Sequence, residues 1–221
     1  PAMTEALLDL KAFELWQNKN FSRVWSNAWL EWLMQGFPLS PLSSKELAIA
    51  LMAYTMEDKP VCEDFNDAVR EAGSSPQQYQ HKFHYKAWHF LLTQALATLR
   101  VTQGQQCRNV FRRVSDVWFQ AQPGDIIRFG QFALTSLDEA VTYGFGTDTV
   151  FEVYTCHGAD ISKFSKKSKQ QEVLIPPFES FNVTNVTQDG KSTRIQLSST
   201  GTHSNYNCEW LGGDITEGTT W

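Results

Sequence analysis

The spacing of apolar side chains changes near the middle of the chain. Before Gly104 they recur every three or four positions, which is the repeat of a helix with one buried face. After it the apolar runs are short and rich in β-branched or aromatic residues, and Gly, Pro, Asn or Asp separates most of them. That pattern is typical of strands joined by turns. Helices followed by a run of strands favour an α+β fold over an alternating parallel sheet.

Ser, Gly and Pro residues mark where the individual elements begin and end. The expected helices cover residues 4–16, 22–35, 43–56, 64–72 and 76–100. The last is the best defined, because its apolar residues form one broad stripe made of Trp88, Leu91, Leu92, Ala95, Leu96 and Leu99. The expected strands cover residues 110–114, 126–133, 149–155, 172–175, 181–186 and 194–197. The Ser/Lys-rich stretch 162–171 is expected to form an exposed loop.

Length and charge narrow the class of protein. The chain has 221 residues, 42% of them hydrophobic, which is enough for a substantial core. We expect one domain over residues 1–221, mainly helical over 1–105 and mainly β over 106–221. The net charge of -5 and the lack of a long Lys/Arg run argue against a nucleic-acid partner. A small anionic ligand needs only one or two well-placed cations and is compatible with this charge.

Cysteines and glycosylation sequons favour an extracellular protein. The four widely spaced cysteines are Cys62, Cys107, Cys156 and Cys208. No C-x-x-C pair occurs, so a structural zinc site is not expected, and the even number fits disulfides without fixing their pairing. The candidate glycosylation sites are Asn20, Asn182 and Asn185. The sequence shows no transmembrane segment, signal peptide or hydrophobic tail, so we expect the mature part of a secreted protein or of a longer lipid-anchored precursor.

The remaining polar residues give few independent clues to chemistry. His81 and His84 share an expected helical face, but a metal site would need a third convergent ligand, and none is evident. We therefore expect no metal. Serine-hydrolase and phosphate-loop motifs do not occur. Taken alone, Arg112 on a short strand and Glu172 at the start of an apolar strand are most simply surface charges.

Eight segments carry more information together than singly. They are AMTEALLDL (Ala2–Leu10), FNDAVREAG (Phe65–Gly73), FHYKAWHFLLTQAL (Phe83–Leu96), VFRR (Val110–Arg113), IRFGQFALTSL (Ile127–Leu137), TCHGADI (Thr155–Ile161), EVLIPPFESF (Glu172–Phe181) and SNYNC (Ser204–Cys208). In this order, and over nearly the whole chain, they resemble the vertebrate ecto-mono-ADP-ribosyltransferases. The resemblance implies a helical N-terminal part packed on a two-sheet β core that forms an NAD cleft.

The resemblance also implies roles for single residues. The family's signature is an Arg on one strand, a Ser-x-Ser strand and an E-x-E loop, which fall on Arg112, Leu134–Ser136 and Gln170–Glu172. Cleavage of the bond between nicotinamide and ribose passes through an oxocarbenium-like state, as in glycoside hydrolysis. Glu172 would stabilise this positive charge, and Arg112 would bind the diphosphate of NAD. NAD would be the substrate, without a metal.

Three positions depart from the family's pattern. Leu134 stands where the first Ser would orient the catalytic Glu, and Thr135 or Ser136 could substitute only if the strand shifts or bulges. Arg113 replaces a Gly that leaves room beside the nicotinamide, so it either crowds the pocket or points to solvent. Gln170 replaces a carboxylate that favours an arginine acceptor, which leaves water as the favoured nucleophile.

The family's disulfide pattern can be compared with the cysteines of this chain. The resemblance implies a bond between Cys107 and Cys156. The usual partner of Cys208 would lie before the chain's first residue, so Cys208 is either free or paired with Cys62.

These features lead to one functional hypothesis and one rival. The hypothesis is an extracellular, monomeric enzyme that cleaves NAD and transfers ADP-ribose to a protein, on arginine by family, or to water. The candidate residues are Glu172, Gln170 and Ser136 for catalysis and Arg112, Arg113 and Thr135 for NAD binding. The rival is a catalytically degenerate extracellular module that keeps the fold and binds NAD or a partner. Leu134 and Arg113 favour the rival, whereas Arg112 and Glu172 favour the enzyme.

Overall fold

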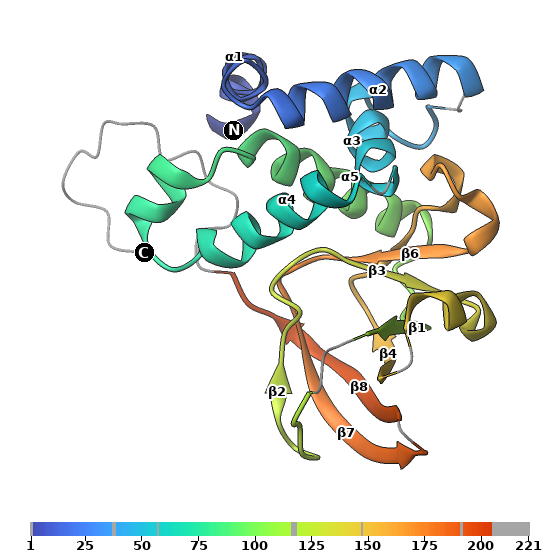
Figure 1. Cartoon of the computed structure of the whole chain (residues 1–221). Helices are drawn as coiled ribbons and strands as arrows, with labels where there is room; N and C mark the ends of the chain where they lie inside the picture. Colours follow the sequence, from blue (N-terminus) through green and yellow to red (C-terminus); the bar gives the residue numbers. More distant parts are fainter. Residues whose placement is uncertain are drawn as a thin grey trace.

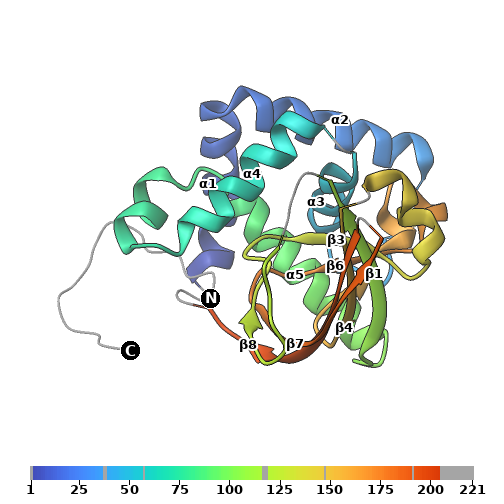
Figure 2. The same ribbon diagram turned by 60° about the horizontal axis from the view of Figure 1, so that its bottom comes forward.

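The helices form one side of the molecule and the strands the other (Figure 1 and Figure 2). The computed structural model describes residues 2–36, 39–56, 58–115, 119–146, 148–190 and 192–204. The helices are α1 (Ala2–Gln17), α2 (Lys19–Gln35), α3 (Lys45–Thr55), α4 (Lys59–Ala72) and α5 (Lys86–Thr102), and a short π-helical turn, η1 (Gln78–Lys82), precedes α5. The predicted order of helices before strands is confirmed.

Local capping explains where α2 lies. The Asn18 side chain accepts a 3.0 Å hydrogen bond from the Phe21 amide, and Gly36, at φ 58°, ends the helix. The helix buries Phe21 and Trp25 against the other helices. The Asn18 cap starts α2 three residues before the predicted start at Ser22.

The prediction of one helix over residues 76–100 is wrong. The chain breaks between η1 and α5, where Phe83 and Tyr85 turn into the core with 2% and 3% of their surface exposed. The new helix α5 is capped from a distance, because Glu14 of α1 accepts hydrogen bonds from the Lys86 amide at 2.8 Å and the Ala87 amide at 3.0 Å. A carboxylate satisfies free N–H groups at a helix start and interacts favourably with its dipole.

The strands follow one hydrogen-bonded order, β2-β7-β8-β4-β1-β3-β6-β5. They are β1 (Arg108–Val114), β2 (Ile126–Ile127), β3 (Ala133–Ser136), β4 (Thr149–Thr155), β5 (Ala159–Asp160), β6 (Glu172–Ile175), β7 (Glu179–Asp189) and β8 (Ser192–Thr202). The β4–β8 pair is parallel and the others are antiparallel. Strands β1 and β3 share one register pair, Phe111↔Ser136, so the strands form two halves joined at one point. The expected α+β class is confirmed, but the two sheets implied by the resemblance are linked through the β1–β3 pair into one eight-stranded sheet.

Two sequence predictions in the strand part need correction. Residues 126–133 do not form one strand, because β2 pairs with β7 while β3 pairs with β6. Residues 162–171 are not simply an exposed loop. They contain the 3₁₀ turns η3 (Ser162–Phe164) and η4 (Ser168–Gln170), and Phe164 and Ser165 are 2% and 1% exposed. A further 3₁₀ segment, η2 (Glu139–Phe145), follows β3.

The helical and strand parts share a hydrophobic core. The cluster built from α2, α3, α4 and α5 also contains Phe132, Phe164 and Leu174 from the strand part. A second cluster, with Phe151 and Phe181, lies among the strands. Shared burial of this kind supports the prediction of a single domain, which stays a prediction because residues 205–221 lie outside the described chain.

The Cys107–Cys156 disulfide is present and joins the start of β1 to the end of β4, with Cα atoms 4.0 Å apart. The buried Glu179 carboxylate holds the adjoining turn by accepting hydrogen bonds from the Cys156 amide at 2.7 Å and the His157 amide at 3.1 Å. Cys62 is half-buried on α4, and Cys208 lies outside the described residues.

The glycosylation candidates differ in exposure. Asn20, in the first turn of α2, and Asn185, on β7, are exposed, whereas Asn182 on β7 is half-buried. None of the described helices combines the length and apolar character that crossing a bilayer requires.

Candidate active site

The pairing of β3 with β6 brings the predicted catalytic residues together. Ser136 lies opposite Glu172 in this antiparallel register, so the two side chains lie on the same face. The Ser136 hydroxyl donates a 2.7 Å hydrogen bond to the main-chain oxygen of Gln170 and accepts one of 3.1 Å from the Asp138 amide. Ser136 therefore fixes the backbone of the turn that carries Gln170.

Glu172 is buried and hydrogen-bonded from a position that sequence reasoning missed. It is 1% exposed, and the Ser165 hydroxyl donates to its Oε2. The Ser165 oxygen in turn accepts a 2.9 Å hydrogen bond from the Lys167 amide. The only sequence signal for this contact is Phe164, an apolar residue within a polar stretch, which is buried in the helical core.

Arg112 is anchored to β3 through the main chain. Its Nη1 donates a 2.7 Å hydrogen bond to the carbonyl oxygen of Leu134, two residues before Ser136. The side chain is half-buried, and burial lowers the pKa of the guanidinium, with nearby Tyr54 acting in the opposite direction. Among the described residues, no carboxylate lies within ion-pair distance of Arg112. A guanidinium has five N–H donors, so this one can still bind an anionic ligand.

Leu134 and Thr135 are both engaged in the protein itself. Leu134 is half-buried, packs against the helical core and lies opposite Leu174. Thr135 is 4% exposed and directs its hydroxyl to the carbonyl oxygen of Val173 at 2.7 Å. Neither side chain offers a hydroxyl to Glu172, and the strand has not shifted to provide one.

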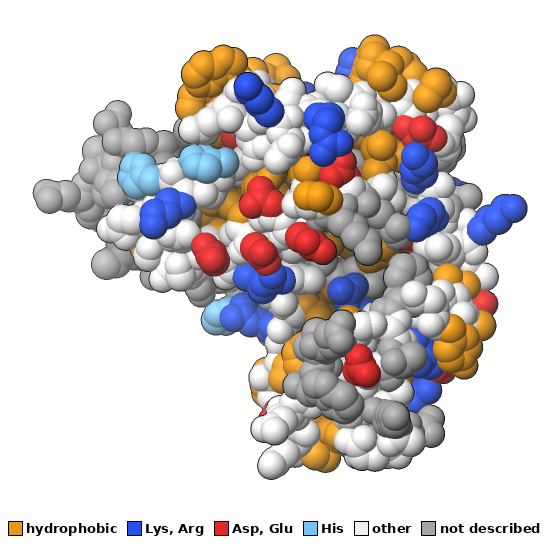
Figure 3. Space-filling model, in the orientation of Figure 1, with side chains coloured by type: hydrophobic (Ala, Val, Ile, Leu, Met, Phe, Trp, Pro, Cys, Tyr) orange, Lys and Arg blue, Asp and Glu red, His pale blue; other side chains and the backbone are white. Residues whose placement is uncertain are grey.

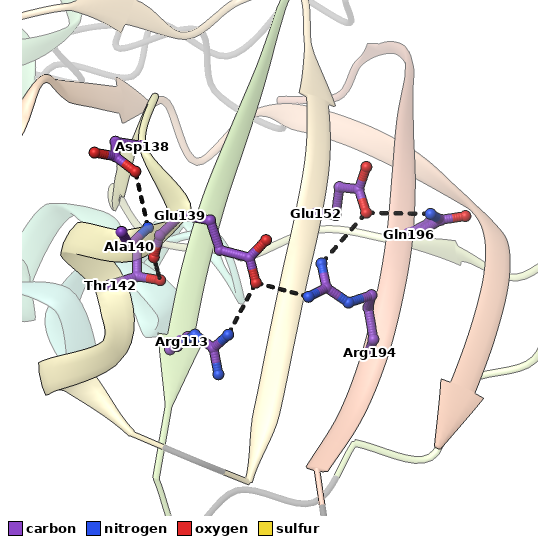
Figure 4. Close-up of polar contacts among 8 residues, drawn as sticks. All are labelled: Arg113, Asp138, Glu139, Ala140, Thr142, Glu152, Arg194 and Gln196. Carbon is purple, nitrogen blue, oxygen red and sulfur yellow. Dashed lines mark hydrogen bonds and ion pairs between the residues drawn. The ribbon is translucent and has the colours of Figure 1, made fainter. Parts of the chain in front are cut away.

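Arg113 lies on the other face of β1, because neighbouring side chains alternate along a strand. It donates a 2.9 Å hydrogen bond to Glu139, which also accepts one of 2.6 Å from Arg194 on β8 (Figure 4). The hydrogen bond from Arg194 is the main cause that lowers the pKa of Glu139, and the hydrogen bond from Arg113 acts in the same direction. The Arg113 guanidinium also lies 4.4 Å from the centre of the Tyr143 ring. Arg113 thus neither crowds Arg112 nor points freely to solvent, but holds η2 against the sheet.

Charged side chains of both signs gather along the junction between the helical and strand parts (Figure 3). A cavity of about 290 Å³ opens in this region between α4, α5 and the loops that follow β2 and β6. Arg70, His89 and Arg128 are among its lining residues, but Arg112 and Glu172 are not. Burial of its imidazole lowers the pKa of His89 to about 4, so this side chain is neutral at physiological pH.

The whole described chain fits one known family. The family model described as NAD:arginine ADP-ribosyltransferase matches residues 1–205.

The chain belongs to the NAD:arginine ADP-ribosyltransferase family.

Among relatives, NAD(P)(+)--arginine ADP-ribosyltransferase 1 of Gallus gallus is 44% identical over 196 residues, covering 88% of this chain and 62% of the relative. GPI-linked NAD(P)(+)--arginine ADP-ribosyltransferase 1 of Homo sapiens is 40% identical over 226 residues, covering 95% and 69%. The chain therefore spans between 62% and 66% of the length of the chicken relatives it matches.

The solved structures agree with this family assignment. The eukaryotic mono-ADP-ribosyltransferase ART2.2 matches with a TM-score of 0.76 and 32% identity, covering 93% of this chain and 89% of that one. A variant of ART2.2 in complex with NAD matches equally well. The ADP-ribosyltransferase fold predicted from the sequence is thereby confirmed.

In this member of the family, the structure groups the candidate residues around β3. Ser136, Gln170 and Glu172 lie at one end of the β3–β6 pair, and Arg112 contacts β3 two residues away. Arg113 lies outside this group.

Proposed function

We propose that this chain binds NAD, breaks the bond between nicotinamide and ribose, and transfers ADP-ribose to a protein acceptor or to water. By family the acceptor is an arginine side chain. The observation that carries the proposal is a half-buried guanidinium, that of Arg112, which has no described carboxylate partner and contacts the strand that pairs with Glu172.

The two residues divide the chemistry between them. Arg112 has N–H donors for the anionic diphosphate, and its bond to the Leu134 carbonyl holds the guanidinium in place. The Glu172 carboxylate faces the ribose, where it stabilises the oxocarbenium-like state that forms as nicotinamide leaves. Water or an acceptor guanidinium then attacks the same carbon of the ribose. No step needs a metal ion.

The acceptor side of the site is formed by the turn before β6. Gln170 precedes Glu172 by two residues, and its backbone is held by Ser136. An uncharged Gln forms hydrogen bonds with a guanidinium but no ion pair. The proposed balance of products therefore favours hydrolysis over arginine transfer.

An extracellular setting is part of the same proposal. It is supported by the Cys107–Cys156 disulfide and by the exposed sequon residues Asn20 and Asn185. Three of the relatives that the chain resembles carry the description GPI-linked. The acceptor is accordingly an extracellular protein, and we propose that the enzyme acts as a monomer.

One observation favours a second function. Glu172 is 1% exposed, which is also compatible with a purely structural carboxylate. The rival function is therefore a non-catalytic module that keeps the fold.

Nicotinamide release from NAD distinguishes the enzyme from the non-catalytic module. Glu172→Gln keeps the shape of the side chain but loses its charge, and release should fall by about 100-fold or more. Glu152→Gln, on β4 in the network around Arg194, is the matched control and should retain activity.

Arg112→Lys tests the other half of the site. Lysine keeps the charge but loses the planar fork, so the KM for NAD should rise by about 10-fold or more. If wild-type protein with the expected circular dichroism releases no nicotinamide, the enzymatic proposal fails and the binding module is favoured. Calorimetric titration with NAD then shows whether the module binds it.

A further inference from the structure

The hydrogen bond on Glu172 comes from an unexpected part of the chain. Strand β3 offers no hydroxyl to this carboxylate, because Leu134 packs into the helical core and Ser136 donates to Gln170. Ser165, from the turn between η3 and η4, donates to the carboxylate. We propose that Ser165 is a positioning residue of the site and orients the Glu172 carboxylate for cleavage of NAD. This inference rests on the proposed function.

Two anchors, one on each side, hold Ser165 where it is. Phe164, its neighbour, is 2% exposed and belongs to the helical core. On the other side the Lys166 amide donates a 3.2 Å hydrogen bond to the Thr55 hydroxyl of α3, which is fully buried. The segment is therefore anchored to the helical part on both sides of Ser165, and the hydroxyl is held by packing before any substrate binds.

The direction of the Ser165 proton follows from its second contact. The Ser165 oxygen accepts a 2.9 Å hydrogen bond from the Lys167 amide. A hydroxyl has one proton to donate, and with its oxygen engaged by an amide that proton is directed to Glu172 Oε2. Successive hydrogen bonds in such a chain polarise and strengthen one another. Ser165 is 1% exposed, so water does not compete for the bond.

The consequence for catalysis is twofold. A hydrogen bond to the ionised carboxylate favours the charged form, which is the form that stabilises an oxocarbenium. It also fixes the rotation of the carboxyl group, so one geometry meets the ribose. Both effects act through Glu172 and its hydrogen bond with Ser165.

Ser165→Ala, Ser165→Thr and a neighbouring control test the role. Ser162→Ala is the control, because its amide is held by Asp160 at 2.9 Å and its hydroxyl makes no hydrogen bond within the described chain. Ser165→Ala should lower kcat for nicotinamide release by roughly 10- to 100-fold, the range for losing a hydrogen bond to a charged group, with the KM for NAD within about 2-fold. The acidic limb of the kcat–pH profile should move to higher pH.

Ser165→Thr should recover most of the lost activity, because it keeps the hydroxyl, and Ser162→Ala should match the wild type. A kcat within about 2-fold of wild type in Ser165→Ala would overturn the proposal. An equal loss in Ser165→Ala and Ser165→Thr with an unmoved acidic limb would also overturn it, since packing alone would then explain the loss.

A second measurement does not depend on turnover. In protein labelled with ¹³C at the glutamate carboxyl carbons, Glu172→Gln identifies the Glu172 signal. The midpoint of its pH titration should rise in Ser165→Ala and stay unchanged in Ser162→Ala. Equal midpoints in wild type and Ser165→Ala would overturn the positioning role. If the wild type releases no nicotinamide, the proposed function fails, yet this titration still decides whether Ser165 holds the carboxylate.

Discussion

Arg112 donates a 2.7 Å hydrogen bond to the main-chain oxygen of Leu134. Any residue at position 134 provides that carbonyl, so the departure of Leu134 from the family's serine leaves the anchor of Arg112 intact. The leucine side chain packs against the helical core. The departure therefore changes what supports Glu172 and not what supports Arg112.

Because the side chain of residue 134 supports neither Arg112 nor Glu172, the effect of Leu134→Ser can be predicted. The half-buried leucine loses apolar contact, and a serine hydroxyl placed against the core lacks a ready partner, so the free energy of unfolding should fall by about 1–3 kcal/mol. Nicotinamide release should change by less than about 3-fold, because Ser165 already orients Glu172. Urea unfolding and a nicotinamide assay measure the two quantities. A gain in turnover of 10-fold or more would show that the β3 hydroxyl, and not Ser165, limits the reaction.

Because Arg113 has a structural role, Arg113→Ala should lower the stability of the protein with little effect on the KM for NAD. The variant removes the hydrogen bond to Glu139 and the contact with the Tyr143 ring. Because these groups are partly solvated, stability should fall by only about 1–2 kcal/mol, and the difference should shrink at high salt. The KM for NAD should stay within about 2-fold of wild type, since Arg113 lies on the other face of β1 from Arg112. A KM increase as large as that of Arg112→Lys would place Arg113 in the nucleotide site instead.

Local patterns predicted the class of the fold and several of its elements. Strands β4 and β6 have the bounds expected from their β-branched residues, because each is a short apolar run enclosed by turn residues. The break before α5 could not be predicted in this way. It depends on Glu14, which caps Lys86 from 72 residues away, and spacing along one helix carries no information on such a partner.

The site was predicted from resemblance more than from pattern. Arg112 and Glu172 were found because they stand in a specific motif, whereas alone they read as surface charges. Ser165 was missed because its role depends on tertiary packing, with Phe164 inserted in the core and Lys166 bound to Thr55. A polar stretch is usually solvated, and Phe164 alone does not show which of the neighbouring serines is buried.

The Glu14 cap should make stability depend on pH. Burial, only partly offset by the hydrogen bonds from Ala87 and Lys86, raises the pKa of Glu14 from 4.5 to about 7. A carboxyl with a raised folded-state pKa adds stability below its unfolded pKa and loses it as pH rises through the folded one. The free energy of unfolding should therefore fall between pH 4.5 and 7, by up to about 3 kcal/mol from this group.

Glu14→Gln isolates that contribution. Glutamine keeps one acceptor oxygen for the Lys86 amide and cannot ionise. Urea unfolding across this pH range should give a smaller slope in the variant than in the wild type. Equal slopes would mean that the two amide hydrogen bonds keep Glu14 ionised throughout.

Gln170 sets the choice between arginine and water in the proposed reaction, and Gln170→Glu should change that choice. The backbone of residue 170 is held by the Ser136 hydroxyl at 2.7 Å, so the new carboxylate should occupy the place of the amide. A carboxylate pairs with a guanidinium through charge-assisted hydrogen bonds, which are worth about 1.5–3 kcal/mol. Transfer to an arginine analogue, relative to nicotinamide released without transfer, should rise by about 10-fold or more.

The position of this charge, and not its mere presence, should decide the outcome. Gln171→Glu is the matched control, because it adds the same charge one residue later at an exposed position whose backbone, at φ 48°, turns away from the regular strand. Mass-detected transfer beside nicotinamide release should show a raised ratio in Gln170→Glu and a wild-type ratio in Gln171→Glu. An equal rise of this ratio in the two variants would mean that the added charge only attracts a cationic acceptor in general. Added salt would then screen the effect. Efficient arginine transfer by the wild type would show that an uncharged residue suffices at position 170, and the proposed preference for water would then be wrong while the roles of Glu172 and Arg112 would stand.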